Sequence, residues 1–487
     1  MPARTTRADY EVPSDPIPAR IARSLEPLDL LALVVTFGAL VVVIGPIDDI
    51  NDLFWHVLIG QQILDGTPIA DLGSGFSYST DNPAWRTGAW ASEALFAGLY
   101  GLGDWPMVLS VIRLGSILGI AGVLWWHVLR RFPSRASVPP FVLAMAVVAT
   151  TVQERPQSLS FIGIALAGGW WFASVARNQP PRWWVVGIVS IAWANLHGLW
   201  VVLPAVLLLA LAGRFLDHGR QDPYLRPLAF GVLASVLGGL LTPIGIDSWL
   251  LPLRLQAAGG IIIEWQRTEL IAWPGYALMI VAGLCLFLVG RCRTRSWILY
   301  TVVVSVFGLS AIRNVTPAVL LLTPLLAALL EKHLEHRAKS SVTPPERRAL
   351  WRVSLAMMVA GSILVGATLI TRDHGPPDDL PVSALSALGR SGESVRLLNE
   401  YNWAGMALFY GPEGLRVGID GRADYYGGDF IRRYERALDG VGLDELVADL
   451  EPTHALLRQD TPAVDLLEFD GWSVQAEDDH FVLLQAP

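Results

Sequence analysis

Several stretches of this sequence are apolar over lengths that match the thickness of a lipid bilayer. A transmembrane helix needs about 20 consecutive, mostly apolar residues, and both "LLALVVTFGALVVVIGPI" (30–47) and "PMVLSVIRLGSILGIAGVLWWH" (106–127) come close to that length. Charged residues make up only 16% of the chain, whereas a soluble protein has about 25%. The sequence therefore predicts a polytopic α-helical membrane protein, whose charge is informative loop by loop rather than as a net value.

The apolar stretches predict about eleven transmembrane helices. The predicted spans are 28–47, 106–127, 138–152, 157–176, 183–196, 199–213, 226–246, 275–290, 296–312, 315–331 and 351–371.

Lys and Arg are distributed unevenly between alternate loops. The N-terminal tail and the loops near 130, 180, 220, 293 and 340 contain 21 of them, while the loops on the opposite side contain five. Cytoplasmic loops carry the excess of basic residues. The prediction is a cytoplasmic tail (1–27), a transmembrane domain (28–371) with a first outer loop at 48–105, and an extracytoplasmic domain (372–487).

The predicted outer domain alternates short strand patterns with helical ones. "SVRLL", "LRVGI", "HALLR" and "HFVLL" are typical of strands, and "NWAGMALFY", "DFIRRYERAL" and "LDELVADL" are typical of helices between them. This alternation favours a small α/β layer structure.

Ionisable and amide side chains gather at the predicted outer ends of the spans. Such groups are costly at membrane depth and usually face a cavity or a partner. Because they come from at least six separate parts of the sequence, they predict one shared outer cavity. They are Asp48, Asp49, Asp52, His56, Glu93, Glu154, Arg155, Asn195, His197, Glu264 and Arg313.

Three of these carboxylates crowd into "GPIDDINDLFWHVLIG" (45–60). Asp48 and Asp52 have the i, i+4 spacing that places like charges on one face of a helix, where they destabilise it unless something offsets them. A cation, a divalent metal ion such as Mg²⁺ or Mn²⁺, or a substrate hydroxyl would do so. The alternative is a solvated loop.

The cations and amides each have a structural alternative. Arg313 in "IRNVTP" interrupts two spans that almost touch, and Arg suits carboxylate or phosphate recognition. Arg155 follows Glu154 in a short turn, where the two residues would also pair with each other. Asn195 and His197 in "WANLHGLW" are as well explained by structural hydrogen bonds as by function.

Two further observations concern ligands. The C-terminal segment "GIDGRADYYGG" (418–428) carries two acids and an arginine between glycines, and either a ligand-binding loop or an ion-paired turn explains it. The sequence has no P-loop, no HExxH zinc pair and no GxSxG elbow.

In combination these motifs resemble a family of bacterial multipass proteins. The matching stretches occur in the same order over most of the chain: 52–56, 155–156, 193–198, Arg313 and 420–424. Two positions depart from the pattern. Ile50 replaces the first Asp of an Asp-x-Asp motif, and Gly88-Ala89 replaces a His-Glu pair.

That family in turn resembles the GT-C superfamily of membrane glycosyltransferases, which includes oligosaccharyltransferase catalytic subunits. The resemblance implies an acidic motif in the first outer loop, carried over here to Asp48, Asp49 or Asp52. It also implies a polyprenyl-phosphate-linked sugar as donor. The expected location is the bacterial cytoplasmic membrane, and the expected acceptor is a cell-envelope glycan or lipid. Membrane lipids are the other expected partners, and nucleic acid is not expected.

The mechanism predicted on this basis is transfer of a sugar to an acceptor hydroxyl. Asp52 or Asp49 would act as the general base, and Arg313 and Arg155 would stabilise the departing phosphate. The remaining predicted substrate-binding residues are His56, Glu93, Asn195, His197 and Glu264. The alternatives are a lipid-linked glycan transporter or flippase, and a non-catalytic membrane protein of glycan assembly.

Overall fold

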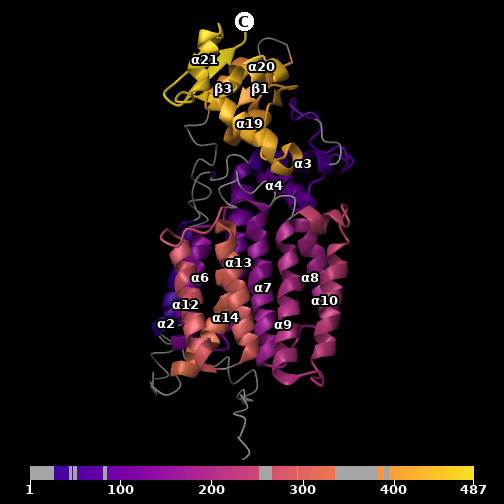
Figure 1. Ribbon diagram of the computed structural model, residues 1–487, viewed down its shortest axis with the longest axis vertical. Helices are drawn as coiled ribbons and strands as arrows, with labels where there is room; N and C mark the ends of the chain where they lie inside the picture. Colours follow the sequence, from indigo (N-terminus) through magenta and orange to yellow (C-terminus); the bar gives the residue numbers. More distant parts are fainter. Residues whose placement is uncertain are drawn as a thin grey trace, which may run out of the picture.

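A helical bundle carries a smaller α/β unit at one end, and the C-terminus lies at the far side of that unit (Figure 1). This computed structural model describes residues 27–42, 47, 52–80, 85–251, 266–292, 294–334, 381–388 and 394–487. The bundle helices in these ranges are α2 (Pro27–Val42), α5 (Gly115–Leu124), α6 (Ser134–Ala149), α7 (Pro156–Ala176), α8 (Trp183–Leu196), α9 (Val202–His218), α10 (Leu225–Gly239), α12 (Gly275–Cys292), α13 (Arg295–Ser310) and α14 (Val315–Leu334).

Within the described ranges, five helical stretches are long and apolar enough to cross a membrane. They are Trp90–Leu129, Pro156–Ala176, Gly198–His218, Gly275–Cys292 and Ile312–Leu334. Shorter apolar helices accompany them. A helix lies over each predicted span as far as residue 331. The predicted span 351–371 falls outside the described residues, so the number of spans stays a prediction.

The longest stretch is interrupted near its outer end. It comprises α4 (Trp90–Leu109), η1 (Ser110–Leu114), α5 and η2 (Trp125–Leu129). The backbone leaves the helical region at Gly103 (φ −175°, ψ 37°) and Asp104 (φ 50°, ψ −155°). Because such a break redirects a helix, the first part of α4 is separated from the part that continues into the bundle. It packs against α3 (Asp52–Leu64) between the bundle and the α/β unit (Figure 1).

α14 is the centre of the bundle. Its side chains are buried from Val315 to Leu329, because α6, α7, α12 and α13 surround it. Small residues allow close helix packing in membranes. Gly168 of α7 is an example, since a Cβ there would lie 3.1 Å from the Leu321 backbone.

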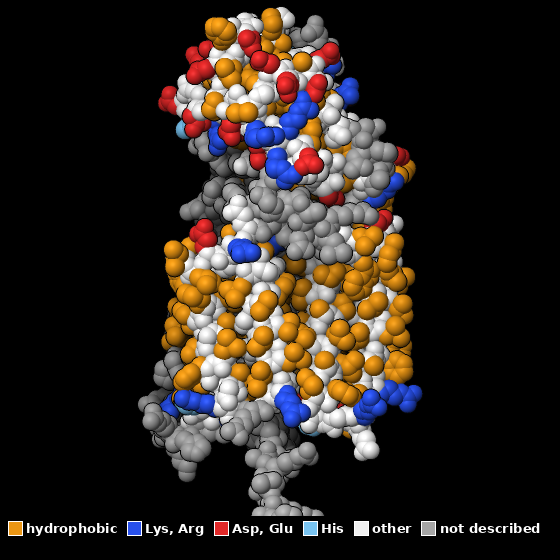
Figure 2. All heavy atoms as spheres, in the orientation of Figure 1, with side chains coloured by type: hydrophobic (Ala, Val, Ile, Leu, Met, Phe, Trp, Pro, Cys, Tyr) orange, Lys and Arg blue, Asp and Glu red, His pale blue; other side chains and the backbone are white. Residues whose placement is uncertain are grey.

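An apolar belt covers the face of the bundle seen in Figure 2, and basic residues lie at its end away from the α/β unit. At that end the Arg130 guanidinium lies 4.2 Å from the ring centre of the exposed Trp126. An aromatic and basic edge of this kind is typical of a membrane–water interface. The molecule is therefore built as a membrane protein.

The α/β unit contains a five-stranded mixed sheet in the order β2-β1-β3-β5-β4. The strands are β1 (Arg396–Asn399), β2 (Arg416–Val417), β3 (His454–Arg458), β4 (Ser473–Glu477) and β5 (Phe481–Gln485). β1 pairs in parallel with β2 and β3, whereas β5 pairs antiparallel with β3 and β4. The sequence did not predict β4, because it is an exposed edge strand without a buried face.

Helices cover the sheet and fix it to the outer layer. They are α16 (Val382–Leu388), α17 (Ala404–Tyr410), α18 (Ala423–Tyr426), α19 (Gly428–Leu438), α20 (Leu443–Leu450) and α21 (Ala463–Phe469).

The α/β unit is attached to the first outer loop by packing and by backbone pairing. α17 packs on α3, and Phe54 of α3 meets Phe409 of α17 at a ring-centre distance of 5.6 Å. Ser77 forms a parallel bridge with Val417, where the Val417 N–H donates to the Phe76 carbonyl at 2.8 Å. The predicted domain boundary at 372 lies outside the described residues, but the attachment brings the 418–428 segment onto the outer layer.

Candidate active site

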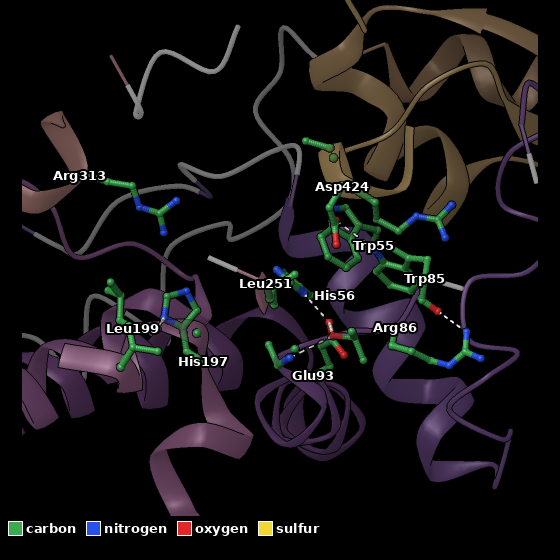
Figure 3. Close-up of a pocket in the computed structure, with 18 of the residues that line it drawn as sticks. Trp55, His56, Trp85, Arg86, Glu93, His197, Leu199, Leu251, Arg313 and Asp424 are labelled. Atoms are coloured by element: carbon green, nitrogen blue, oxygen red, sulfur yellow. Dashed lines mark hydrogen bonds and ion pairs between the residues drawn. The ribbon is translucent and has the colours of Figure 1, made fainter. Parts of the chain in front are cut away.

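A cavity of about 210 Å³ lies where one end of the bundle meets the α/β unit (Figure 3). Three parts of the chain enclose it: the segment from α3 to the start of α4, the ends of bundle helices next to the α/β unit, and the loop that leads into α18. The lining residues are Trp55, His56, Trp85, Arg86, Thr87, Gly88, Ala89, Glu93, His197, Gly198, Leu199, Val201, Leu251, Arg313, Asn314, Gly421, Arg422, Ala423 and Asp424. Four of the predicted site residues are therefore together: His56, Glu93, His197 and Arg313.

His56 and Glu93 form a buried pair on one wall. His56 Nδ1 lies 3.1 Å from Glu93 Oε1, which also accepts a hydrogen bond from the Thr87 hydroxyl at 2.7 Å. Gly60, one turn after His56 on α3, makes the pair possible, because a Cβ there would lie 2.0 Å from the Glu93 carbonyl oxygen. Glu93 is fully buried, and within the described structure its Oε2 has no hydrogen-bond partner. An acceptor oxygen is thus available beside the cavity.

His197 lies between α8 and η3 (Gly198–Val201) on another wall. Its Nδ1 lies 3.0 Å from Ser160 Oγ and accepts from the Leu199 N–H at 3.3 Å. Burial, then the positive charge of Arg313, then His56 lower the pKa of His197 to about 3. The imidazole is therefore neutral at physiological pH.

Arg313 lies in η5 (Ile312–Asn314), the short break between α13 and α14. Its Nη2 donates to Gln157 Oε1 of α7 at 3.2 Å. Figure 3 shows the guanidinium directed from η5 toward the side of the cavity that His197 lines. A guanidinium in this position suits an anionic ligand group.

Asp52 and Arg155 lie beside the cavity rather than in its wall. Asp52 begins α3, and its Oδ2 lies 3.5 Å from Arg155 Nη2. Its Oδ1 accepts from Nε1 of the lining residue Trp55 at 3.2 Å. Both charged side chains keep about a quarter of their surface exposed, at 25% and 24%. Burial, then the nearby Asp52, raise the pKa of Tyr401 in the α/β unit, so Asp52 also faces that unit.

Asn195 joins helices through its hydrogen bonds and does not line the cavity. Its Oδ1 accepts from Trp90 Nε1 at 2.6 Å, and its amide donates to the carbonyls of Ile191 and Leu241 at 2.7 and 3.0 Å. These bonds join α4, α8 and the segment after α10, and Asn195 is not among the lining residues. Asp48, Asp49 and Glu264 lie outside the described residues.

The α/β unit contributes residues that the sequence marked only as a possible ligand loop. Arg422 is neutralised by the buried Asp420, with Nη2 2.7 Å from Oδ2, and its Nη1 donates to the Gly73 carbonyl at 3.1 Å. Asp424 accepts from Trp85 Nε1 at 3.1 Å, and burial raises the pKa of its carboxyl. This loop therefore covers the cavity as well as forming an ion-paired turn.

Sequence reasoning missed Trp85, Arg86 and Thr87. They lie in an irregular segment, so no helix or strand pattern marked them. Arg86 Nη1 donates to the Trp85 carbonyl at 2.6 Å.

The described residues do not form a metal site around Asp52. Groups of three or more His, Cys, Asp or Glu side chains are absent from these ranges. The Asp52 carboxylate already faces the Arg155 guanidinium and an indole N–H, and a guanidinium next to the carboxylate repels a metal ion. Because Asp48 lies outside the described residues, a metal site formed by Asp48 and Asp52 stays a prediction.

The fold is that of a polytopic α-helical membrane protein with a cavity where the bundle meets the α/β unit. Archaeal oligosaccharyltransferase AglB from Archaeoglobus fulgidus, in complex with an inhibitory peptide and a dolichol-phosphate, is similar with a TM-score of 0.55 and 12% identity, over 88% of this chain and 69% of that one. The expected resemblance to GT-C glycosyltransferases is thus confirmed for the fold.

Two structures of ArnT from Cupriavidus metallidurans also match. The apo state has a TM-score of 0.48 and 16% identity over 94% of this chain and 96% of that one. The structure bound to undecaprenyl phosphate has a TM-score of 0.49 and 14% identity over 94% and 97%. No protein-family model and no curated protein matches the sequence.

Proposed function

We propose that this protein is a membrane glycosyltransferase that moves a sugar from a polyprenyl-phosphate donor to an acceptor hydroxyl at the outer face of a bacterial cytoplasmic membrane. The observation that carries the proposal is the cavity at the junction of the apolar bundle and the α/β unit, lined by Arg313, His197 and the His56–Glu93 pair. The fold shared with AglB, whose structure contains a dolichol-phosphate, supports this kind of donor.

The junction suits the two halves of such a donor. The polyprenyl chain would remain against the apolar bundle, while the phosphate and sugar enter the cavity. Arg313 would bind the phosphate from η5, and Arg155 would support it from beside Asp52. His56 and Glu93 would bind sugar or acceptor hydroxyls, because they place acceptor atoms at the opposite wall.

The proton of the acceptor hydroxyl needs a base in the first outer loop. We assign this role to Asp52, which lies one turn before His56 on the same side of α3 and keeps enough exposure to meet a substrate. Asp48 and Asp49 remain proposed partners of Asp52, and Glu264 remains a proposed binding residue. The acceptor class remains a cell-envelope glycan or lipid.

The first test uses purified protein in lipid nanodiscs with radiolabelled polyprenyl-phosphate sugars. With a cell-envelope extract as acceptor, we expect label in the acceptor and release of polyprenyl phosphate, and none from the corresponding sugar nucleotide. Arg313→Leu should reduce transfer by at least about tenfold, since charge-assisted contacts to an anion contribute about 1.5–3 kcal/mol. Arg295→Leu, at the other end of α13, should not.

Two results would contradict the proposal. Release of label from sugar nucleotides alone would exclude the lipid donor. Movement of intact lipid-linked sugar between leaflets, without cleavage, would favour the transporter alternative.

Metal dependence is tested separately. We expect transfer to survive dialysis against EDTA, because the Arg155 guanidinium already lies next to the Asp52 carboxylate at 3.5 Å. Loss of activity on chelation, with recovery on adding Mg²⁺ or Mn²⁺, would instead place a divalent cation at Asp52, with Asp48 as its second carboxylate.

A further inference from the structure

The hydrogen bonds around His197 determine which of its ring nitrogens carries the proton. The Leu199 backbone N–H is only a donor, so Nδ1, which it contacts at 3.3 Å, must be an acceptor. Ser160 agrees with this assignment. Its Oγ accepts from the Trp193 indole N–H at 2.8 Å, and its own proton can be donated to Nδ1 at 3.0 Å. With Nδ1 unprotonated, the neutral ring carries its proton on Nε2.

The surroundings keep this tautomer neutral. Arg313 on η5 and His56 on α3 both disfavour a positive charge on His197, and burial disfavours it further. The other charged groups that line the cavity are Arg86, Glu93, Arg422 and Asp424. Burial, Arg313 and His56 together lower the pKa of His197 to about 3. His197 therefore offers an N–H donor throughout the physiological pH range and does not take up a proton.

The donors on this wall select the type of ligand atom. Figure 3 shows Arg313 and His197 on the same side of the cavity, away from Trp85 and Asp424. A guanidinium only donates, and so does the protonated Nε2 of the His197 ring, whose Nδ1 already accepts from the Leu199 N–H. A sugar hydroxyl needs an acceptor as well, whereas a phosphate oxygen offers acceptors alone.

We propose that His197 donates its Nε2–H to an oxygen of the donor phosphate, next to Arg313, and stabilises the charge that develops there during sugar transfer. This inference rests on the proposed function. In the reaction the acceptor oxygen bonds to the anomeric carbon, and the bond from that carbon to the phosphate oxygen breaks with its electron pair. The hydroxyl proton goes to Asp52. The phosphate changes from a diester with one negative charge to a monoester that carries two, while His197 keeps its proton.

A pair of variants separates hydrogen-bond donation from packing. His197→Leu has similar volume but no donor, and we expect kcat to fall about 10²–10³-fold, as for removal of one oxyanion donor. His197→Gln supplies an amide N–H near the position of Nε2 and should stay within about tenfold of wild type, because a neutral donor remains. KM for the acceptor and the shape of the pH profile should not change in either variant.

The control is a histidine that does not line the cavity. We use His127 in η2, which is buried and lies at the opposite end of the bundle. His127→Leu should retain wild-type kcat. Equal activity of His197→Leu and His197→Gln, at any level, would overturn the donor role.

A binding experiment tests the same contact without turnover. Undecaprenyl phosphate and undecaprenol are titrated into nanodiscs that contain the wild type or His197→Leu. We expect the variant to lose at least about fivefold in affinity for the phosphate, corresponding to about 1 kcal/mol, and nothing for the alcohol. If the wild type binds both lipids equally, the proposed polyprenyl-phosphate sugar donor is contradicted, and the proposed function with it. If it prefers the phosphate and His197→Leu does too, only the role of His197 fails.

Discussion

Asp52→Asn is expected to abolish sugar transfer while leaving the protein folded and able to bind polyprenyl phosphate. Asparagine has the shape of aspartate and keeps an oxygen for the Trp55 N–H, but it cannot take a proton from a hydroxyl. A positioned general base contributes about 10²–10⁴-fold to the rate, so kcat should fall by at least that range. Transfer is measured with radiolabelled donor in nanodiscs, and folding by size-exclusion chromatography.

The control for this variant lies at the other end of the same helix. Asp65 follows α3 and is exposed, so Asp65→Asn makes the same chemical change away from the cavity and should retain full activity. Wild-type activity in Asp52→Asn would remove Asp52 as the base. A loss in Glu93→Gln together with that result would move the role to the His56–Glu93 pair.

The bundle was predictable from sequence because the length of an apolar helix is set by bilayer thickness. The spans near 157–176 and 315–331 agree with α7 and α14 within a few residues of their ends. Arg313 was recognisable because an arginine between two membrane spans needs an anionic or polar environment. Helix breaks inside apolar sequence were not predictable, and the predicted span 226–246 is wrong at its end because α10 stops at Gly239.

The composition of the cavity wall was only partly predictable. Trp85 and Asp424 are bonded partners although 339 positions separate them, and periodicity carries no information at that distance. Asn195 had a suitable residue type, yet its hydrogen bonds are used to join helices. The apolar residues of α3 show a similar limit. α4 and α17 cover them, and a sequence pattern does not say whether an apolar helix side meets lipid or protein.

The structure also explains an arginine that lies inside the predicted span 106–127. Arg113 in η1 donates its Nε–H to Glu154 Oε2 at 2.7 Å, and both side chains are buried. Glu154 was predicted to pair with Arg155 or to face the cavity. In the structure Glu154 pairs with Arg113, and Arg155 Nη2 lies 3.5 Å from Asp52 Oδ2. A paired Arg113 offers no polar path through the bilayer, which weakens the transporter alternative.

Removing one member of this pair is expected to have the largest effect on stability. Glu154→Gln leaves the Arg113 charge buried opposite a neutral amide. Breaking a buried ion pair on one side costs about 3–5 kcal/mol, so the unfolding midpoint in detergent should fall markedly. Arg113→Met should be similarly destabilised, because it leaves the Glu154 carboxylate, which is 0% exposed, without this guanidinium.

The double variant Arg113→Met, Glu154→Leu distinguishes this electrostatic explanation from simple loss of packing. With neither charge present, no uncompensated ion remains, and a well-packed apolar replacement of a buried pair is often neutral. We therefore expect the double variant to be more stable than either Glu154→Gln or Arg113→Met alone, as measured by denaturant titration of each. The single variant Glu154→Leu completes the comparison. If the destabilisations of Arg113→Met and Glu154→Leu add up to that of the double variant within about 0.5 kcal/mol, the two side chains do not interact. Because Glu154 precedes Arg155, recovery of stability without recovery of transfer would show that the pair also positions Arg155 beside Asp52.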